Sequence, residues 1–550
     1  MDDYEKSKIC TKRHKKLKTL LKIIYGYDNF RPKQYEILNR IFNGEDICGI
    51  LATGYGKSIC FQIPALYLNK PAVIVVPLIS LMDDQRMILE KLGITSCCFN
   101  STVYNKYELK KSILNGEYKF VYITAEAVIN QKEFLITLNE RLGISVIAID
   151  EAHCISSYGY DFRPAYRKLT FFKEILPDVP ILAVTATATN VVADDICKVL
   201  KFKLNNIIKN SFDRPNLYIE IREKSKPKNI ATDILPILAK HVDQCVIIYC
   251  ITINETGDIA EILKLNKLKC KTYHSKLDND KKTKVHHDFV SGKVKIIIAT
   301  IAFGMGINKS NVRAVIHYGC PKNIEGYYQE IGRAGRDGLK SSCYTIYSYQ
   351  DFKRQEFFIS GIVDDKYKKN QTMLLNKIKN FMINNKICRR SILLEYFNED
   401  YKKNNCESCD ICCGVTKTND AVVEIKQDVS VEARMLIDLI DATKPRRFGL
   451  LIYIDVLRGA SNKKILKFFP KNKFYGKGKH RSANWWKEMG QNLIDQEFLM
   501  KTRINTGNFP TLITEVAPKG ITWANIDSLN ILLDTSISET LDLMSMSTCI

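Results

Sequence analysis

The segment Leu51-Ala52-Thr53-Gly54-Tyr55-Gly56-Lys57-Ser58 joins an apolar, strand-like run to a helix-like one. Glycines in such a turn let backbone N–H groups approach a phosphate at the N-terminus of a helix. In this arrangement Lys57 reaches the β- and γ-phosphates of a nucleotide and Ser58 binds Mg²⁺, so residues 53–58 form a predicted phosphate site. The sequence departs from the strict phosphate-loop pattern at Leu51, where that pattern has glycine. The alternative to a phosphate site is a chance Gly-Lys-Ser at a strand–helix turn.

A pair of carboxylates later in the chain supports the phosphate site. Residues 145–149 are a buried-strand run that ends in Asp150-Glu151-Ala152-His153. An Asp at the C-terminal end of such a strand can bind nucleotide-bound Mg²⁺, and Glu151 beside it can orient and deprotonate the attacking water. A solvated acid pair is the alternative, which the presence of both motifs disfavours.

A third motif is Gln329-Glu330-Ile331-Gly332-Arg333-Ala334-Gly335-Arg336. Two arginines three residues apart lie on one face of a predicted helix, and arginine offers a rigid fork for a γ-phosphate. We predict catalytic roles for Gln329, Arg333 and Arg336, with a surface salt-bridge face as the alternative. If the arginines and Lys57 belong to different domains, the nucleotide lies in a cleft that hydrolysis opens and closes.

Strand-like and helix-like segments alternate up to about residue 350, which predicts an α/β fold of two tandem parallel-sheet domains. Strands are expected at 49–52, 72–76, 120–124, 146–150 and 181–185 in the first sheet. The second set is 246–250, 271–274, 295–299, 312–318 and 342–347. Asp213-Arg214-Pro215-Asn216 is the predicted joint between the two sheets.

The predicted organisation has further parts beside these two domains. The segments are a basic, aperiodic arm at 1–18, α/β domains at 19–212 and 213–352, a helical and cysteine-rich subdomain at 353–414, a polar linker at 415–429, a mixed domain at 430–525 and an acidic tail at 526–550.

The composition points to a polyanionic partner. The 550 residues include 82 Lys and Arg against 60 Asp and Glu, a net charge of +22, which favours nucleic acid or an acidic membrane surface. No apolar run approaches the ~18 residues that span a bilayer, and the N-terminus lacks the apolar core of a signal peptide. Most of the 18 cysteines stand singly in apolar runs, which predicts a reducing intracellular compartment, either nucleus or cytoplasm.

One cysteine cluster is different. Cys406, Cys409 and Cys412 are spaced by two residues, and Cys388 lies upstream after a predicted helix. Four such thiols suit one structural, tetrahedral Zn²⁺. Cys412 is preferred over the adjoining Cys413 because it keeps the spacing, and a redox pair or free thiols are the alternatives.

The last domain is strongly basic. Residues 444–487 hold thirteen Lys or Arg against one acid, and aromatic residues lie among them, which predicts phosphate contacts. Residues 499–516 suit a hairpin with its turn at 505–508. Phe509 near the tip is a candidate base-pair wedge, or it packs locally.

Several stretches are similar to motifs of the RecQ family of superfamily 2 DNA helicases, from about residue 25 to 520. They are 26–34, 77–85, 183–188, 302–309 and the loop 154–164. The resemblance implies two RecA-like domains, a helical zinc-binding subdomain and a winged-helix domain. It also implies that Tyr27 stacks on adenine, which Arg31 and Gln34 contact.

The loop 154–164 resembles the family's aromatic-rich loop, which senses single-stranded DNA and triggers ATP hydrolysis. Tyr158 and Phe162 offer stacking faces beside Arg163, with packing into the domain core as the alternative. The sequence departs from the family pattern at Ser157, Tyr158 and Tyr160. The segments around Arg447 and Arg458 resemble the winged helix that binds duplex DNA.

The resemblance thus implies an ATP-dependent 3′-to-5′ DNA helicase that uses Mg²⁺ and Zn²⁺ and acts in DNA repair, recombination or replication. Its expected partners are single-stranded and duplex DNA, without a membrane. The motif Asp150-Glu151-Ala152-His153 also allows an RNA helicase, and a nucleic-acid-dependent ATPase without unwinding activity is the other alternative.

Overall fold

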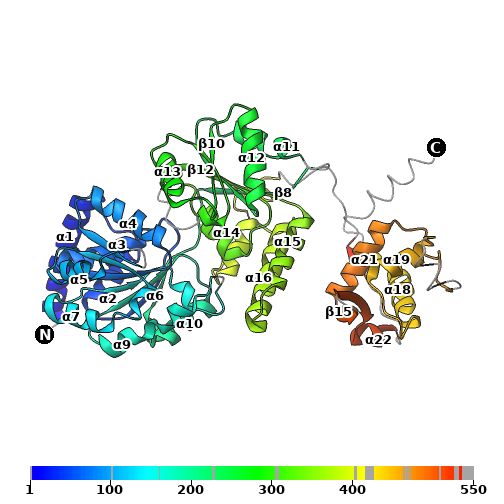
Figure 1. Cartoon of the computed structure of the whole chain (residues 1–550), viewed down its shortest axis with the longest axis horizontal. Coiled ribbons are helices and arrows are strands. Elements are labelled where there is room, and N and C mark those ends of the chain that lie inside the picture. Colours follow the sequence, from blue (N-terminus) through cyan, green and yellow to red (C-terminus); the bar gives the residue numbers. More distant parts are fainter. Residues whose placement is uncertain are drawn as a thin grey trace. The chain divides into compact units, whose positions relative to one another are not determined.

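The computed structural model describes residues 3–100, 103–159, 161–225, 229–303, 309–401, 405–414, 426–461, 465, 469, 472–506, 509–524 and 532–534. They fall into two compact units, Met1–Lys417 and Thr418–Ile550 (Figure 1). Within the described ranges, no helix is both long enough and apolar enough to cross a membrane.

The first sheet has seven parallel strands in the order β3-β4-β2-β5-β6-β1-β7. These strands are β1 Ile47–Ile50, β2 Ala72–Val76, β3 Ser96–Phe99, β4 Phe120–Thr124, β5 Ile147–Ile149, β6 Ile181–Thr185 and β7 Ile207–Lys209. The central strands are buried along their whole length, because helices cover both faces of a parallel sheet (Figure 1).

The helices of this domain connect the parallel strands. They are α1 Asp3–Tyr25, α2 Gln34–Phe42, α3 Lys57–Leu68, α4 Ile79–Lys91, α5 Lys106–Leu114, α6 Ala125–Val128, α7 Lys132–Leu142, η1 Ala152–Ile155, α8 Pro164–Arg167, η2 Lys168–Phe171, α9 Phe172–Ile175, α10 Asn190–Leu200 and η3 Leu204–Asn206.

The second sheet has six parallel strands in the order β10-β11-β9-β12-β13-β8. They are β8 Leu217–Glu223, β9 Cys245–Cys250, β10 Cys270–Tyr273, β11 Ile296–Ala299, β12 Val312–Tyr318 and β13 Ser341–Tyr347. The helices are α11 Ile230–Ala239, α12 Ile253–Leu265, α13 Asn279–Val290, η4 Ile301–Phe303 and α14 Ile324–Ile331. The predicted α/β fold with two tandem parallel sheets is confirmed.

The N-terminal segment differs from its prediction. Residues 1–18 were expected to be an aperiodic arm, but α1 runs through this boundary to Tyr25. Leu17 and Leu21 lie one helical turn apart and are 0% and 1% exposed, and Leu17 packs against side chains of α2 and α3. Two leucines in a lysine-rich stretch are a weak periodic signal, which is why the sequence did not reveal the helix.

Three further helices complete the first unit. They are α15 Tyr349–Ser360, α16 Asp365–Ile383 and α17 Arg389–Tyr396. α15 and α16 pack side by side as a hairpin (Figure 1). The cysteine-rich segment follows α17 in the chain.

The second unit combines helices with an antiparallel hairpin. Its elements are α18 Ser430–Ala442, α19 Leu450–Arg458, α21 Ala483–Asp495, β15 Leu499–Thr506, β16 Phe509–Val516 and α22 Pro518–Ala524. The predicted hairpin forms and pairs Leu499 with Val516, but Asn505 and Thr506 of the predicted turn belong to β15 and pair with Pro510 and Phe509. Trp485 and Trp486 are core residues, 4% and 0% exposed, so these aromatics of the basic stretch pack internally.

Two predicted irregular segments contain short strands. β14 (Lys426–Asp428) lies in the predicted linker and β17 (Leu532–Asp534) in the predicted tail, and the two pair antiparallel. The remainder of the tail, the turn residues 507–508, Tyr160 and residues 304–308 lie outside the described residues. So does the side chain of Phe509, the candidate wedge.

Candidate functional site

The predicted phosphate loop connects β1 to α3. Gly54 and Gly56 have φ angles of 79° and 87°, in the left-handed region where glycine avoids a steric penalty. α3 begins at Lys57, so its unpaired N–H groups lie at the end of this loop. Ser58 Oγ is 3.5 Å from Gln85 Oε1, which belongs to α4.

The predicted adenine segment packs directly on the phosphate loop. Gln34 Nε2 donates to the carbonyl oxygens of Tyr55 and Gly56, both at 3.1 Å, and Arg31 Nη1 donates to Gly54 O at 2.5 Å. The structure thus brings Arg31 and Gln34 to the loop, whereas Tyr27 is 54% exposed.

The predicted carboxylates lie at the end of β5. Burial, reinforced by the charge of Glu151, raises the pKa of Asp150 to about 6. Burial also acts to raise the pKa of Glu151, but Lys57 and a hydrogen bond with His153 outweigh it and lower that pKa to about 2. Lys57 is therefore close enough to influence both carboxylates, and Glu151 is ionised at neutral pH.

The second sheet's domain supplies the third predicted motif. Gln329 Nε2 donates to Glu151 Oε1 at 3.4 Å, and a Cβ on Gly54 would lie 3.0 Å from Arg336 Cγ. Arg333 is only 3% exposed, and burial, together with neighbouring arginines, lowers the pKa of Arg336 to about 9. The motif from one domain therefore faces the phosphate loop of the other.

The arginines are not on a helix, so that part of the prediction is wrong. α14 ends at Ile331, and turns follow it through Gly332 and Gly335, the latter with a φ of 55°. A Cβ on Gly332 would lie 3.0 Å from Thr53 Cβ, so the glycines also permit close approach to the phosphate loop.

Arg214, which no sequence motif predicted, connects the two domains through hydrogen bonds. Its guanidinium donates to Thr53 O at 3.2 Å, and to Gly332 O, Ala334 O and Gly335 O at 3.4, 3.0 and 2.9 Å. Arg214 stands in the predicted joint between the sheets, and this position was the only signal for it.

The residues present fit a nucleotide and Mg²⁺. Thr53 Oγ1 and Arg333 Nε are buried atoms without a hydrogen-bond partner among the described residues. Arg333 is close enough to Glu151 to lower its pKa, and Thr53 adjoins Gly54 with its positive φ, which suits phosphate oxygens and a divalent cation.

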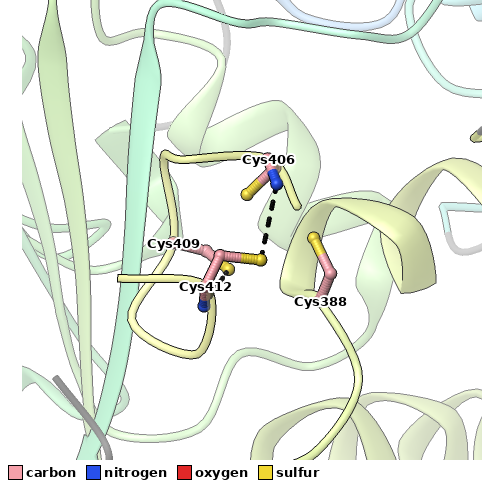
Figure 2. A group of neighbouring side chains, drawn as sticks. All are labelled: Cys388, Cys406, Cys409 and Cys412. Atoms are coloured by element: carbon pink, nitrogen blue, oxygen red, sulfur yellow. Dashed lines mark hydrogen bonds between the residues drawn. The ribbon is translucent and has the colours of Figure 1, made fainter. Parts of the chain in front are cut away.

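The four predicted zinc ligands lie together (Figure 2). Their sulfur atoms are all within 4.8 Å of one another, with Cys388 at the start of α17 and the other three on the following loop. The backbone N–H groups of Cys406, Ser408 and Cys412 donate to cluster sulfurs, each at 3.4 Å. Cys413 is exposed and is not in the cluster. Four converging thiols fit a closed zinc site.

The cysteine loop is joined to the second sheet. Cys409 forms a parallel bridge with Ile219 of β8, at the edge of that sheet. Asp410 is fully buried, accepts from Arg389 Nε and Nη2 at 3.1 and 3.2 Å, and accepts from Ile221 N at 3.0 Å. The subdomain and the sheet therefore share buried polar contacts.

α17 also packs against α14, the helix before Arg333. Phe397 stacks on Phe212 with ring centroids 4.3 Å apart and meets Tyr328 edge-on at 5.0 Å. The Tyr396 hydroxyl donates to Glu325. Residues at the end of α17 thus pack against α14, the helix that leads into the predicted catalytic motif.

The aromatic loop follows η1, directly after Glu151. Tyr158 is 45% exposed, and Phe162 and Arg163 are partly exposed, so the loop is not simply domain core. Arg163 Nη1 donates to Pro77 O at 2.6 Å.

In the second unit, Arg447 pairs with Glu515 of β16 at 2.9 Å, and Arg458 is exposed in the last turn of α19. Lys473, Lys477 and Lys487 are also exposed. The described basic residues therefore include several with side chains available to a polyanion.

Two parallel-sheet domains that meet around a phosphate loop define a nucleotide-hydrolysing motor of the helicase class. Family models agree: "DEAD/DEAH box helicase" matches residues 31–196 and "Helicase conserved C-terminal domain" matches 228–338. "RecQ zinc-binding" matches residues 349–413 and "RQC domain" matches 424–525. The chain therefore belongs to the RecQ family of superfamily 2 helicases.

Full-length relatives support this assignment. A protein named as a putative ATP-dependent RNA helicase, from Acanthamoeba polyphaga mimivirus, is 58% identical over 97% of each chain. The ATP-dependent DNA helicase RecQ of Bacillus subtilis is 37% identical over 91% of this chain and 82% of that protein. The structure of the DUF1998 helicase MrfA bound to DNA shares the fold, with a TM-score of 0.50 and 14% identity over 93% of this chain and 63% of that one.

The family confirms the predictions of an ATP-hydrolysing helicase and of ATP, Mg²⁺ and Zn²⁺ as its cofactors. The predicted RecA-like, zinc-binding and winged-helix composition is confirmed as well.

Proposed function

We propose that this chain is an ATP-dependent DNA helicase that translocates 3′ to 5′ on single-stranded DNA and unwinds duplexes. The proposal rests on two contacts between the domains. Gln329 of the second domain donates to Glu151 of the first, and Arg336 of the second lies beside Gly54 of the first. Hydrolysis at such a junction changes how the domains hold each other, which is the basis of stepwise movement.

In the proposed reaction, Lys57 holds the β- and γ-phosphates while Ser58 and Asp150 hold the cation. Mg²⁺ held there would supply positive charge that offsets the charge of the phosphates. Glu151 orients the attacking water and accepts its proton, and Gln329 at 3.4 Å holds the Glu151 carboxylate in place. Arg333 and Arg336 stabilise the charge that develops on the γ-phosphate.

The proposal also covers adenine recognition, the domain boundaries and the cellular compartment. Tyr27, Arg31 and Gln34 recognise adenine beside the phosphate loop. We also propose domain boundaries near residues 212, 352 and 429, of which the second lies within α15. Outside the four-cysteine cluster most described cysteines are buried, which supports a reducing intracellular compartment in which DNA repair, recombination or replication takes place.

The decisive experiment compares nucleic acids. ATPase activity of the full chain is measured with single-stranded DNA and with RNA of the same sequence, and strand displacement is measured on duplexes with 3′ or 5′ tails. The proposal requires stronger stimulation by DNA and unwinding of 3′-tailed duplexes. Stimulation without displacement would instead support a remodeller that does not unwind.

An RNA helicase is the second candidate, because the 58% identical viral relative carries that name. RNA-stimulated hydrolysis with unwinding of RNA duplexes would favour it over the DNA helicase.

We expect Tyr158→Ala and Phe162→Ala to keep basal ATPase activity near normal and to lose stimulation by single-stranded DNA. Each ring is a proposed stacking face, worth about 1–3 kcal/mol per base, and lies off the nucleotide site. Titration of ATPase activity with single-stranded DNA provides the measurement. Tyr107→Ala, at a 76% exposed tyrosine of the same domain, is the matched control. Full stimulation in both loop variants would identify these residues as packing residues.

Replacing Lys473, Lys477 and Lys487 by Gln is expected to weaken duplex binding for every sequence. Each phosphate interaction that the substitutions remove should reduce the slope of log K against log salt by about 0.9. Fluorescence anisotropy at several salt concentrations measures this, and ATP hydrolysis stimulated by single strands should persist. The same change at the exposed residues Lys264, Lys267 and Lys269 of the first unit controls for net charge. An unchanged salt slope would remove this basic face from the proposed interface.

A further inference from the structure

The aromatic loop is held by a helix from a different part of the chain. Asn370 of α16 donates through Nδ2 to Tyr158 O at 3.3 Å and to Ser157 O at 3.5 Å. Lys366 lies one helical turn earlier, and its Nζ is 5.7 Å from the centroid of the Tyr158 ring. Both contacts reach the loop from the hairpin α15–α16.

The loop is also tied to the first domain at its other end. Arg163 Nη1 donates to Pro77 O at 2.6 Å, and Tyr158 N donates to Ser156 Oγ at 3.2 Å. The stretch around Tyr158 therefore has one anchor within the loop itself and one on α16.

The position of the loop is linked to the catalytic carboxylate by short, packed backbone. Gly159 lies so close to η1 that an added Cβ would be 2.8 Å from His153 O. His153 Nδ1 is 3.3 Å from Glu151 Oε2 and 2.9 Å from Thr185 Oγ1. A displacement of the loop at Tyr158 therefore acts on the segment that carries Glu151.

We infer that Asn370 is a positioning residue for the loop that couples single-stranded DNA to ATP hydrolysis. By fixing the carbonyl groups of Ser157 and Tyr158, its amide fixes the direction in which the Tyr158 ring is presented. A stacking face that is already oriented loses less conformational entropy when a base binds. The inference rests on the proposed function, since it assumes that Tyr158 contacts DNA.

The contact requires a side chain at position 370 that donates hydrogen bonds. An amide nitrogen donates to two carbonyl oxygens, whereas a carboxylate in the same place offers only acceptors to them. Asn370→Asp should therefore be as damaging as Asn370→Ala, although Asp has nearly the shape of Asn. A longer amide, in Asn370→Gln, keeps the donor and should restore part of the coupling.

The test uses the full chain and measures ATPase activity against single-stranded DNA concentration. In Asn370→Ala and Asn370→Asp, we expect basal turnover to stay within about two-fold. The stimulated rate should fall about five-fold, within the range expected when these hydrogen bonds are lost. The half-saturating DNA concentration should rise by a similar factor. Asn376→Ala, at an exposed position of the same helix, should match the wild type in both.

A double variant separates positioning from general stability. If Asn370 acts through Tyr158, then Asn370→Ala should have no further effect in the Tyr158→Ala background. Additive losses, or equal falls in basal and stimulated rates, would overturn the inference. Full stimulation in Asn370→Ala combined with lost stimulation in Tyr158→Ala would overturn the inference alone. Full stimulation in Tyr158→Ala would overturn both the inference and the DNA-sensing role of the loop.

Discussion

Glu151→Gln is expected to lower ATP turnover by about 10²–10⁴-fold, the usual contribution of a general base, while nucleotide binding persists. Gln keeps the shape of Glu151 but cannot accept the proton of the attacking water. Lys57→Ala should abolish turnover by another route, because it removes contacts to the phosphates and so weakens binding. Turnover and the affinity for a fluorescent nucleotide, measured on the same preparations, distinguish the two losses.

Glu126→Gln provides the matched control, since Glu126 is an exposed acid of the same domain. It should leave both turnover and affinity unchanged. If Glu151→Gln and Lys57→Ala lose nucleotide binding to the same degree, then Glu151 contributes to binding. The assignment of Glu151 as the general base would then be wrong.

Cys409→Ser is expected to release the zinc and unfold the segment 388–412. Cys409 is fully buried and bridges to Ile219, and zinc binding in such sites is coupled to folding, with apparent free energies of about 10–16 kcal/mol in small zinc domains. The loss should appear first as faster proteolysis near α17 and a lower melting temperature. The ATP site should be affected later, through the contacts of α17 with α14.

Cys413→Ser is the control for this prediction, because Cys413 is exposed beside the cluster. It should keep one zinc per chain by metal analysis, which Cys409→Ser should lose. Wild-type protein that is fully active without stoichiometric zinc would refute the site.

The central strands were predictable because burial on both faces makes them uniformly apolar. All ten expected strands form, with ends that differ by a few residues. In the two large parallel sheets, the strands that were missed, β3, β7 and β8, occupy sheet edges. β8, for example, places Tyr218, Glu220 and Arg222 between its apolar residues in Leu-Tyr-Ile-Glu-Ile-Arg-Glu, so its apolar signal is diluted.

In the candidate site, residues in local motifs were predictable from the sequence, whereas residues brought together only by folding were not. The phosphate loop and the acids are local patterns whose spacing reflects their chemistry. Arg214 carries no local signature, because its partners lie about 120–160 residues away in sequence and only the folded chain brings them together. Trp485 and Trp486 show the opposite case. Their place in a basic, aromatic stretch suggests a binding surface, but both side chains are buried in the core of their domain.

The four hydrogen bonds of Arg214 have a consequence for the timing of the cycle. An opening wide enough to let ADP leave separates Thr53 O from the carbonyls after α14, so Arg214 must lose its hydrogen bonds to one domain or to the other. Chemistry inside the closed cleft requires no such rupture. We therefore expect the departure of spent nucleotide, rather than cleavage of the phosphate bond, to be the slow event that sets the pace of the motor.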